Sequence, residues 1–145
     1  MVVKVKKLKE NAQPPAYGSA MAAGADLYAC LQEALTLPAG GTALIPTGIA
    51  IELPQGTVGL VYARSGLATK RGLAPANKVG VIDCDYRGEI LVSLYNHSAE
   101  AQTVLPGERV AQLVITPYFS AEFEQTNNLS QTARDQGGFG STGRV

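Results

Sequence analysis

The chain has 145 residues, a formal net charge of zero, 46% hydrophobic residues and 17% charged residues. This length suits one domain with a sizeable core, and the apolar content excludes disorder throughout. The zero net charge argues against duplex nucleic acid as a partner, because phosphate binding needs a basic surplus. The one local basic run, residues 4–9, fits the solvent face of an edge strand.

Cysteine and histidine are too few for a structural zinc site, which needs about four nitrogen or sulfur ligands. Cys30 and Cys84 stand far apart, and His97 is the single histidine. Since no secretory signal is visible, we expect free thiols and a cytoplasmic protein. Apolar runs are all shorter than the roughly 20 residues that span a bilayer, so no membrane association is expected.

Short runs rich in Val, Ile, Thr and Tyr, separated by Gly, Pro and Asn, predict β-strands along most of the chain. In chain order these runs cover residues 2–8, 25–30, 42–53, 57–63, 79–83, 89–96, 102–105 and 109–119. Many short strands with turns between them favour an all-β sandwich or barrel. We expect a single domain over 1–145, with a β core at 1–129 and a C-terminal arm at 130–145.

One segment predicts a short helix. It begins near Ser65, which suits an N-cap, and Gly72 suits the position that ends it. A helix N-terminus presents free backbone N–H groups, which bind anions.

The C-terminal segment SQTARDQGGFGSTGRV (130–145) is polar and rich in glycine. Alone, it buries too little surface to offset its ordering entropy, which favours a flexible tail. Its glycines also permit close backbone approach to a ligand and anion-binding turns, which favours a phosphate loop. Physical reasoning from the sequence leaves both a flexible tail and a phosphate loop open.

The stretch GVIDCDYRGEI (80–90) crowds Asp83, Asp85 and Tyr86 into four positions of a strand-like run. Alternation along this run places Cys84 on the opposite face, in packing.

Five stretches, in this order and spacing, resemble the motifs of the trimeric deoxyuridine triphosphatases (dUTP pyrophosphatases): GADLYA (24–29), ARSG (63–66), NKVGVIDCDYRGE (77–89), PGERVAQL (106–113) and RDQGGFGSTG (134–143). The resemblance implies a distorted jelly-roll-like β subunit, a homotrimer with sites between subunits, and an arm that closes over a neighbour's site. It also implies Mg²⁺-assisted hydrolysis of dUTP to dUMP and pyrophosphate. That activity would limit uracil incorporation into DNA and supply dUMP for thymidylate synthesis. Cys84 and Asp135 depart from the residues common in the family.

The resemblance implies that the third motif binds the nucleoside and supplies the catalytic residue. Asp83 is then the general base that activates the water attacking the α-phosphorus, and partial desolvation would raise its basicity. Tyr86 packs on the deoxyribose and leaves no room for a 2′-hydroxyl. The backbone from Asn77 to Asp83, including Val81 and Ile82, resembles a hairpin that reads uracil. Leu91 also touches substrate, or else is a core strand residue.

The other motifs hold phosphates. Arg64, Ser65, Gly66 and Gln112 resemble phosphate contacts; alternatively, Ser65 is only an N-cap and Arg64 pairs with Asp85. Asp26 resembles the aspartate that acts on Mg²⁺ through water, or is a plain strand-end residue. Arg109 is expected to stabilise the sheet or the subunit interface. In the arm, Phe139 stacks on uracil, Gly140 permits close approach, and the γ-phosphate is held by Arg134, Ser141 and Thr142.

Two other functions remain possible at this level. A dCTP deaminase shares the architecture but generally lacks the glycine-rich arm. A nucleotide-binding or protein-interaction module would keep the scaffold without the chemistry.

Overall fold

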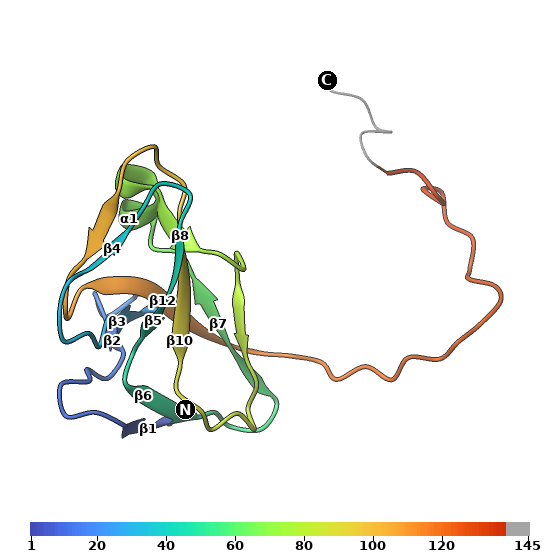
Figure 1. Cartoon of the computed structure of the whole chain (residues 1–145). Helices are drawn as coiled ribbons and strands as arrows, with labels where there is room; N and C mark the ends of the chain where they lie inside the picture. The colour runs from blue at the N-terminus through green and yellow to red at the C-terminus, as the bar shows by residue number, and fades with distance from the viewer. Residues whose placement is uncertain (139–145) are drawn as a thin grey trace.

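The computed structural model describes residues 1–138, and these form a mostly β fold with one short helix (Figure 1). The elements in chain order are β1 (Lys4–Lys7), β2 (Ala16–Tyr17), β3 (Ala25–Tyr28), β4 (Leu35–Leu37), β5 (Thr42–Pro46), β6 (Ile49–Glu52), β7 (Thr57–Tyr62), α1 (Ser65–Arg71), β8 (Leu73–Pro75), β9 (Gly80–Ile82), β10 (Leu91–Asn96), β11 (Gln102–Val104) and β12 (Arg109–Pro117). The all-β prediction is confirmed.

The strands form antiparallel sheets of unequal size. The largest has the order β2-β3-β12-β7-β9, and a second has the order β5-β10-β8. Two strand pairs, β1-β6 and β11-β4, complete the described fold. Strand β9 pairs with β7 on one side and forms the edge of the large sheet, so part of its backbone is free of strand partners.

The sequence placed most strands correctly but read 42–53 as one strand. The structure breaks this run at Thr47 and Gly48, where β5 pairs with β10 and β6 pairs with β1. Gly48 has φ +69°, and a Cβ there would lie 2.6 Å from the Cys30 sulfur, so only glycine fits. Strands β2, β4 and β8 were missed because two or three residues carry too little periodicity.

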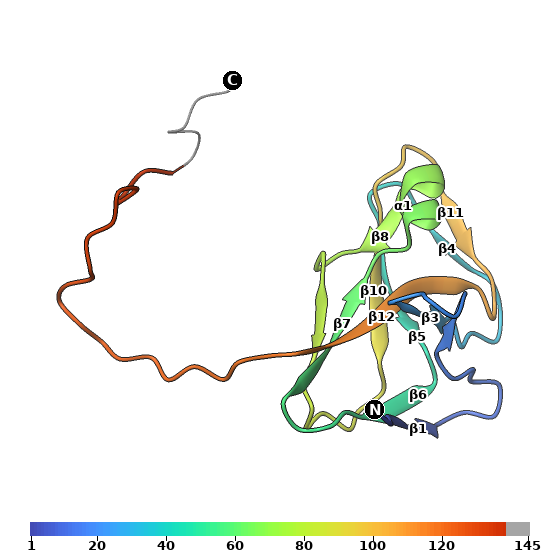
Figure 2. The same ribbon diagram turned by 180° about the vertical axis from the view of Figure 1, so that it is seen from behind.

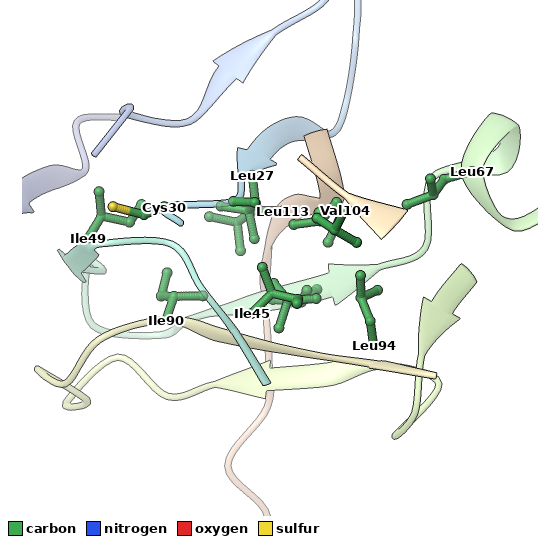
Figure 3. Packing of buried hydrophobic residues seen from close by; sticks show 14 of the residues in the cluster. Leu27, Cys30, Ile45, Ile49, Leu67, Ile90, Leu94, Val104 and Leu113 are labelled. Atoms are coloured by element: carbon green, nitrogen blue, oxygen red, sulfur yellow. The ribbon is translucent and has the colours of Figure 1, made fainter. Parts of the chain in front are cut away.

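The core lies between the two main sheets. Leu27 and Leu113 from the large sheet face Ile45, Ile90 and Leu94 from the other layer (Figure 3). All five side chains are at most 3% exposed. Leu67 of α1 also joins this cluster, which fixes one face of the helix to the core.

Beyond β12 the chain leaves the folded body. Figures 1 and 2 show residues 118–138 running outward as one extended segment. Its Phe119, Phe123 and Leu129 are almost fully exposed. The arm therefore departs at Tyr118 in this single chain, earlier than the expected residue 130. Within residues 1–138, no helix is long and apolar enough to cross a membrane.

Candidate active site

The predicted site residues that precede the arm line two clefts on the surface of the chain. The first, here the β9 cleft, has a volume of about 330 Å³. It is lined by Leu44, Val61, Pro75, Asn77, Gly80, Val81, Ile82, Asp83, Tyr86, Glu89, Leu91, Val92 and Ser93. Ligand pockets typically measure roughly 300–1,000 Å³. The β9 cleft is thus large enough for a small ligand.

A tight turn after β9 sets the positions of Asp83 and Tyr86. The Tyr86 backbone N–H donates to the Asp83 carbonyl oxygen at 3.1 Å. The Tyr86 hydroxyl donates to the Glu89 carbonyl oxygen at 3.0 Å. A Cβ on Gly88 would lie 2.4 Å from the Tyr86 hydroxyl oxygen, so the ring lies directly against this glycine. Both side chains line the β9 cleft, and the Tyr86 ring is held in place by its hydroxyl.

Asp83 is exposed in the single chain, which differs from the expected partial desolvation. The reason is that β9 is an edge strand and the turn after it projects beyond the sheet. Any desolvation of the Asp83 carboxylate therefore has to come from a ligand or another chain.

The backbone expected to read a base forms a turn rather than a two-stranded hairpin. Residues 76–79 join β8 to β9, which lie in different sheets. Lys78 takes φ +65°, and the Val79 N–H donates to the Asn77 carbonyl oxygen at 2.7 Å. The free edge of β9 nevertheless lies on the cleft, so its unpaired backbone donors and acceptors are available to a flat polar ligand.

Cys84 packs against the core, as expected, but it lies in the turn after β9, so the alternation of a strand is not what places it there. Tyr118, where the arm begins, lies next to it. The Cys84 thiolate charge and a hydrogen bond to Cys84 raise the pKa of the Tyr118 phenol, with smaller contributions from burial and from Asp83 and Asp85. The start of the arm is thus close to the turn that carries Asp83.

The second cleft, here the α1 cleft, has a volume of about 260 Å³. Its lining comes from β3, β12, the start of α1 and the loop before β3: Gly18, Ala22, Gly24, Asp26, Arg64, Ser65, Gly66, Arg109 and Gln112. Two arginines and one aspartate leave a net positive charge. Together with hydroxyl, amide and backbone donors, this charge suits an anion.

Asp26 holds both arginines of this cleft. Arg64 Nε donates to Asp26 Oδ1 at 2.7 Å, and Arg109 Nη1 donates to Asp26 Oδ2 at 3.2 Å. The suggested pairing of Arg64 with Asp85 is therefore wrong. Sequence reasoning missed the Asp26 partnership because the three residues come from three separate segments. The Asp26 side chain is 12% exposed, so its charge is compensated where water is scarce.

Ser65 is the first helical residue, not the N-cap. Arg64 occupies the N-cap with extended backbone and makes no side-chain cap bond. Among the described residues, the Ser65 hydroxyl has no hydrogen-bond partner. The N-cap alternative for Ser65 is therefore wrong, and its hydroxyl is free for a ligand in the α1 cleft.

Gln112 is fixed between β7 and the loop before β3. Its Nε2 donates to the Ala63 carbonyl oxygen at 2.8 Å. A Cβ on Gly24 would lie 2.3 Å from Gln112 Oε1, so Gly24 leaves the space that the amide occupies. Close packing against the Gln112 amide thus explains why the first motif has a glycine at position 24.

The arm residues fall partly outside the described chain. Arg134 is exposed and its Nε donates to the Gly137 carbonyl oxygen at 2.9 Å. Asp135 has φ +40°. Phe139, Gly140, Ser141 and Thr142 lie outside the described residues. The structure therefore brings Arg134 to neither cleft.

Comparison with known proteins assigns the family. A sequence profile of the dUTPase family matches residues 10–143. The chain belongs to the dUTPase family. It is 51% identical to a deoxyuridine 5′-triphosphate nucleotidohydrolase of Desulfitobacterium hafniense, over 97% of this chain and 95% of that one. It is 48% identical to a protein of the same name from Yarrowia lipolytica, over 99% of this chain and 90% of that one. The prediction of an enzyme of this family is confirmed.

Solved structures of phage dUTPases share the fold. A mutant dUTPase of Staphylococcus bacteriophage 80alpha, solved with dUpNHpp, matches with a TM-score of 0.89 and 28% identity, over 98% of both chains. A mutant dUTPase from phage phi11 of S. aureus, described with a structural Mg(II) ion, matches with a TM-score of 0.81 and 25% identity. That match covers 90% of this chain and 100% of the phage chain.

Proposed function

We propose that this dUTPase-family protein hydrolyses dUTP to dUMP and pyrophosphate, with the nucleoside in the β9 cleft and phosphates in the α1 cleft. The observation that carries the proposal is the division of chemistry between the clefts. One presents a carboxylate, a phenol and a free strand edge, and the other presents two arginines, a hydroxyl and an amide. A deoxynucleoside triphosphate requires both kinds of surface.

Asp83 acts as the general base. Its carboxylate accepts a proton from the water whose oxygen attacks the α-phosphorus. The bond from this phosphorus to the bridging oxygen breaks, and pyrophosphate leaves. The exposed position of Asp83 in the single chain leaves room for the water, and closure of an arm would remove bulk solvent around it.

Tyr86 selects the sugar and the β9 edge selects the base. The ring is held by its hydroxyl on Glu89 and lies against Gly88, so it cannot easily retreat. A 2′-hydroxyl would meet this ring and lose its own hydrogen bonds. Asn77 and the backbone of Val81 and Ile82 would pair with uracil, while Leu91, which also lines the β9 cleft, would pack on the nucleoside.

The α1 cleft binds the phosphates through Arg64, Ser65, Gly66 and Gln112. Mg²⁺ fits this arrangement when held mainly by triphosphate oxygens and water. Asp26 has both oxygens engaged by arginines but keeps a spare lone pair on each, which suits contact through water. When bound, Mg²⁺ would offset the negative charge of the phosphates.

The arm supports a homotrimer with sites between subunits. Residues 118–138 carry three almost fully exposed apolar side chains, Phe119, Phe123 and Leu129, which need a covering surface. A neighbouring subunit provides one, and places Arg134, Phe139, Gly140, Ser141 and Thr142 over that neighbour's nucleotide. The assembly would work in the cytoplasm, limiting uracil in DNA and supplying dUMP.

The decisive experiment measures pyrophosphate release from dUTP, UTP, dCTP and dTTP with Mg²⁺. We expect turnover of dUTP alone. Comparable turnover of UTP would refute the role of Tyr86, and ammonia release from dCTP would indicate a deaminase instead. Deleting 134–145 should leave a folded trimer with severely reduced turnover. Loss of the trimer would show that these residues serve assembly.

A further inference from the structure

Helix α1 is too short to hold its own position. Its seven residues span roughly 10 Å at about 1.5 Å per residue. Isolated helices below about 12 residues are marginal in water, and this one has no side-chain N-cap bond. Leu67 is its buried residue, and directly before the helix Arg64 bonds to Asp26. The placement of Ser65 and Gly66 therefore depends on this bond and on what anchors the other end.

That end is anchored by Arg71, the last helical residue. Its Nε donates to Gln102 Oε1 at 3.1 Å, its Nη2 donates to the Thr103 carbonyl oxygen, and its Nη1 bonds to Glu108 Oε1. Each guanidinium nitrogen thus has a partner on β11 or on the turn before β12. The Arg71 and Glu108 side chains are 31% and 22% exposed, so the pair is partly shielded from water. A planar guanidinium with three directed bonds restricts rotation of the helix end.

Glu108 connects the end of the helix to the strands that line the α1 cleft. Its Oε2 accepts from the Leu105 N–H at 2.9 Å, which closes the turn before β12. Its backbone pairs the turn with Ala29, next to β3, because the Ala29 N–H donates to the Glu108 carbonyl oxygen at 2.8 Å. Glu108 directly precedes Arg109. The Arg71–Glu108 pair therefore joins the helix that carries Ser65 to the strand that carries Arg109 and Gln112.

We propose that Arg71 and Glu108 are positioning residues for phosphate binding: their ion pair, together with the bonds of Asp26 to Arg64 and Arg109, fixes the distance between the two walls of the α1 cleft. This inference rests on the proposed function. Figure 2 shows α1 at the same end of the body as β4, β8 and β11, consistent with this anchoring. Groups that bind a phosphate must hold their spacing closely, and a misplacement of about 1 Å can cost about 100-fold in rate.

The test uses the full chain with Arg71→Gln, Arg71→Lys and Glu108→Gln. For each variant, kcat and KM for dUTP are measured. Calorimetry gives the dissociation constants of inorganic pyrophosphate and of deoxyuridine, and a thermal melt gives the midpoint. We expect kcat/KM to fall about 10- to 100-fold. The pyrophosphate constant should rise, while the deoxyuridine constant, which reports the β9 cleft, stays within about twofold. Arg71→Lys should recover only part of the loss, since an ammonium lacks the directed fork.

Lys4→Gln is the matched control, because it breaks an exposed ion pair with Glu52 and neither residue lines the β9 cleft or the α1 cleft. It should leave all constants unchanged. A merely structural role for Arg71 would lower the thermal midpoint and leave the pyrophosphate constant within about twofold of wild type, which overturns the inference. If Arg71→Gln does not fold, the same constants measured on Glu108→Gln decide between the two roles. If the wild type fails to hydrolyse dUTP, the proposed function fails, while pyrophosphate binding still decides the inference.

Discussion

Replacing Gly24 by alanine should disable Gln112 without touching it chemically. The added Cβ would lie 2.3 Å from Gln112 Oε1 and 3.0 Å from its Cδ, so the amide must swing away. Swinging breaks the 2.8 Å bond from Nε2 to the Ala63 carbonyl oxygen. Loss of one such hydrogen bond costs about 0.5–1.5 kcal/mol of folding stability. The two nearest obstructing atoms are at the end of a flexible side chain, whereas Gln112 Cβ, at 3.2 Å, has to shift by a few tenths of an ångström.

The effect on catalysis should exceed the effect on stability. A hydrogen bond to a charged phosphate is worth about 1.5–3 kcal/mol, so losing it lowers kcat/KM roughly 10- to 150-fold. The assay is steady-state pyrophosphate release by Gly24→Ala, Gln112→Ala and the double variant, with thermal midpoints. Lys4→Gln is the control, since Lys4 lines neither the β9 cleft nor the α1 cleft.

If Gly24 acts through Gln112, the double variant should be no worse than Gln112→Ala alone. If the fold losses in kcat/KM of the two single variants multiply in the double variant, the two residues act independently and this reasoning is refuted. A wild-type kcat/KM in Gly24→Ala would refute it as well.

Three further changes test other parts of the site and surface. Asp83→Asn should keep dUTP binding and lower kcat by at least about 100-fold, measured by single-turnover kinetics and titration with a non-hydrolysable analogue; a near-normal rate would remove Asp83 as the base. Gly88→Ala places a Cβ 2.4 Å from the Tyr86 hydroxyl oxygen, so it should displace the Tyr86 ring. The kcat/KM for UTP relative to that for dUTP should then rise. An unchanged ratio would count against the role of Tyr86 in excluding the 2′-hydroxyl. Lys4→Gln should raise the pKa of Glu52, because the Lys4 hydrogen bond and charge lower it in the wild type. Because the folded-state pKa of Glu52 is lowered, the pair with Lys4 stabilises the protein at pH values above the unfolded-state pKa. This stabilisation is lost as the pH falls through the folded-state pKa. NMR titration of Glu52 and thermal midpoints at neutral and acid pH check the sign of this effect.

Local patterns were enough for much of the fold. Alternating apolar runs located most strands, since a side-chain period of two is visible within about five or six residues. The same reasoning failed at Gly48, where one positive-φ glycine divides a continuous apolar run between two sheets. It was off by one residue at Ser65: the N-cap is Arg64, whose side chain bonds to Asp26 instead of capping the helix.

By itself, the sequence determined the β class and the chemical types available for a site. These depend on residue identity and short spacing, which local physics reads directly. The family was indicated by the resemblance of its five motifs, in order, to those of known proteins. Only the tertiary structure decided which charges meet. Asp26, Arg64 and Arg109 come from three segments, and the pair Arg71–Glu108 joins two of the same segments a second time. Pairing over such separations depends on sheet order and register, because these set which side chains share a cleft, and no local pattern encodes them.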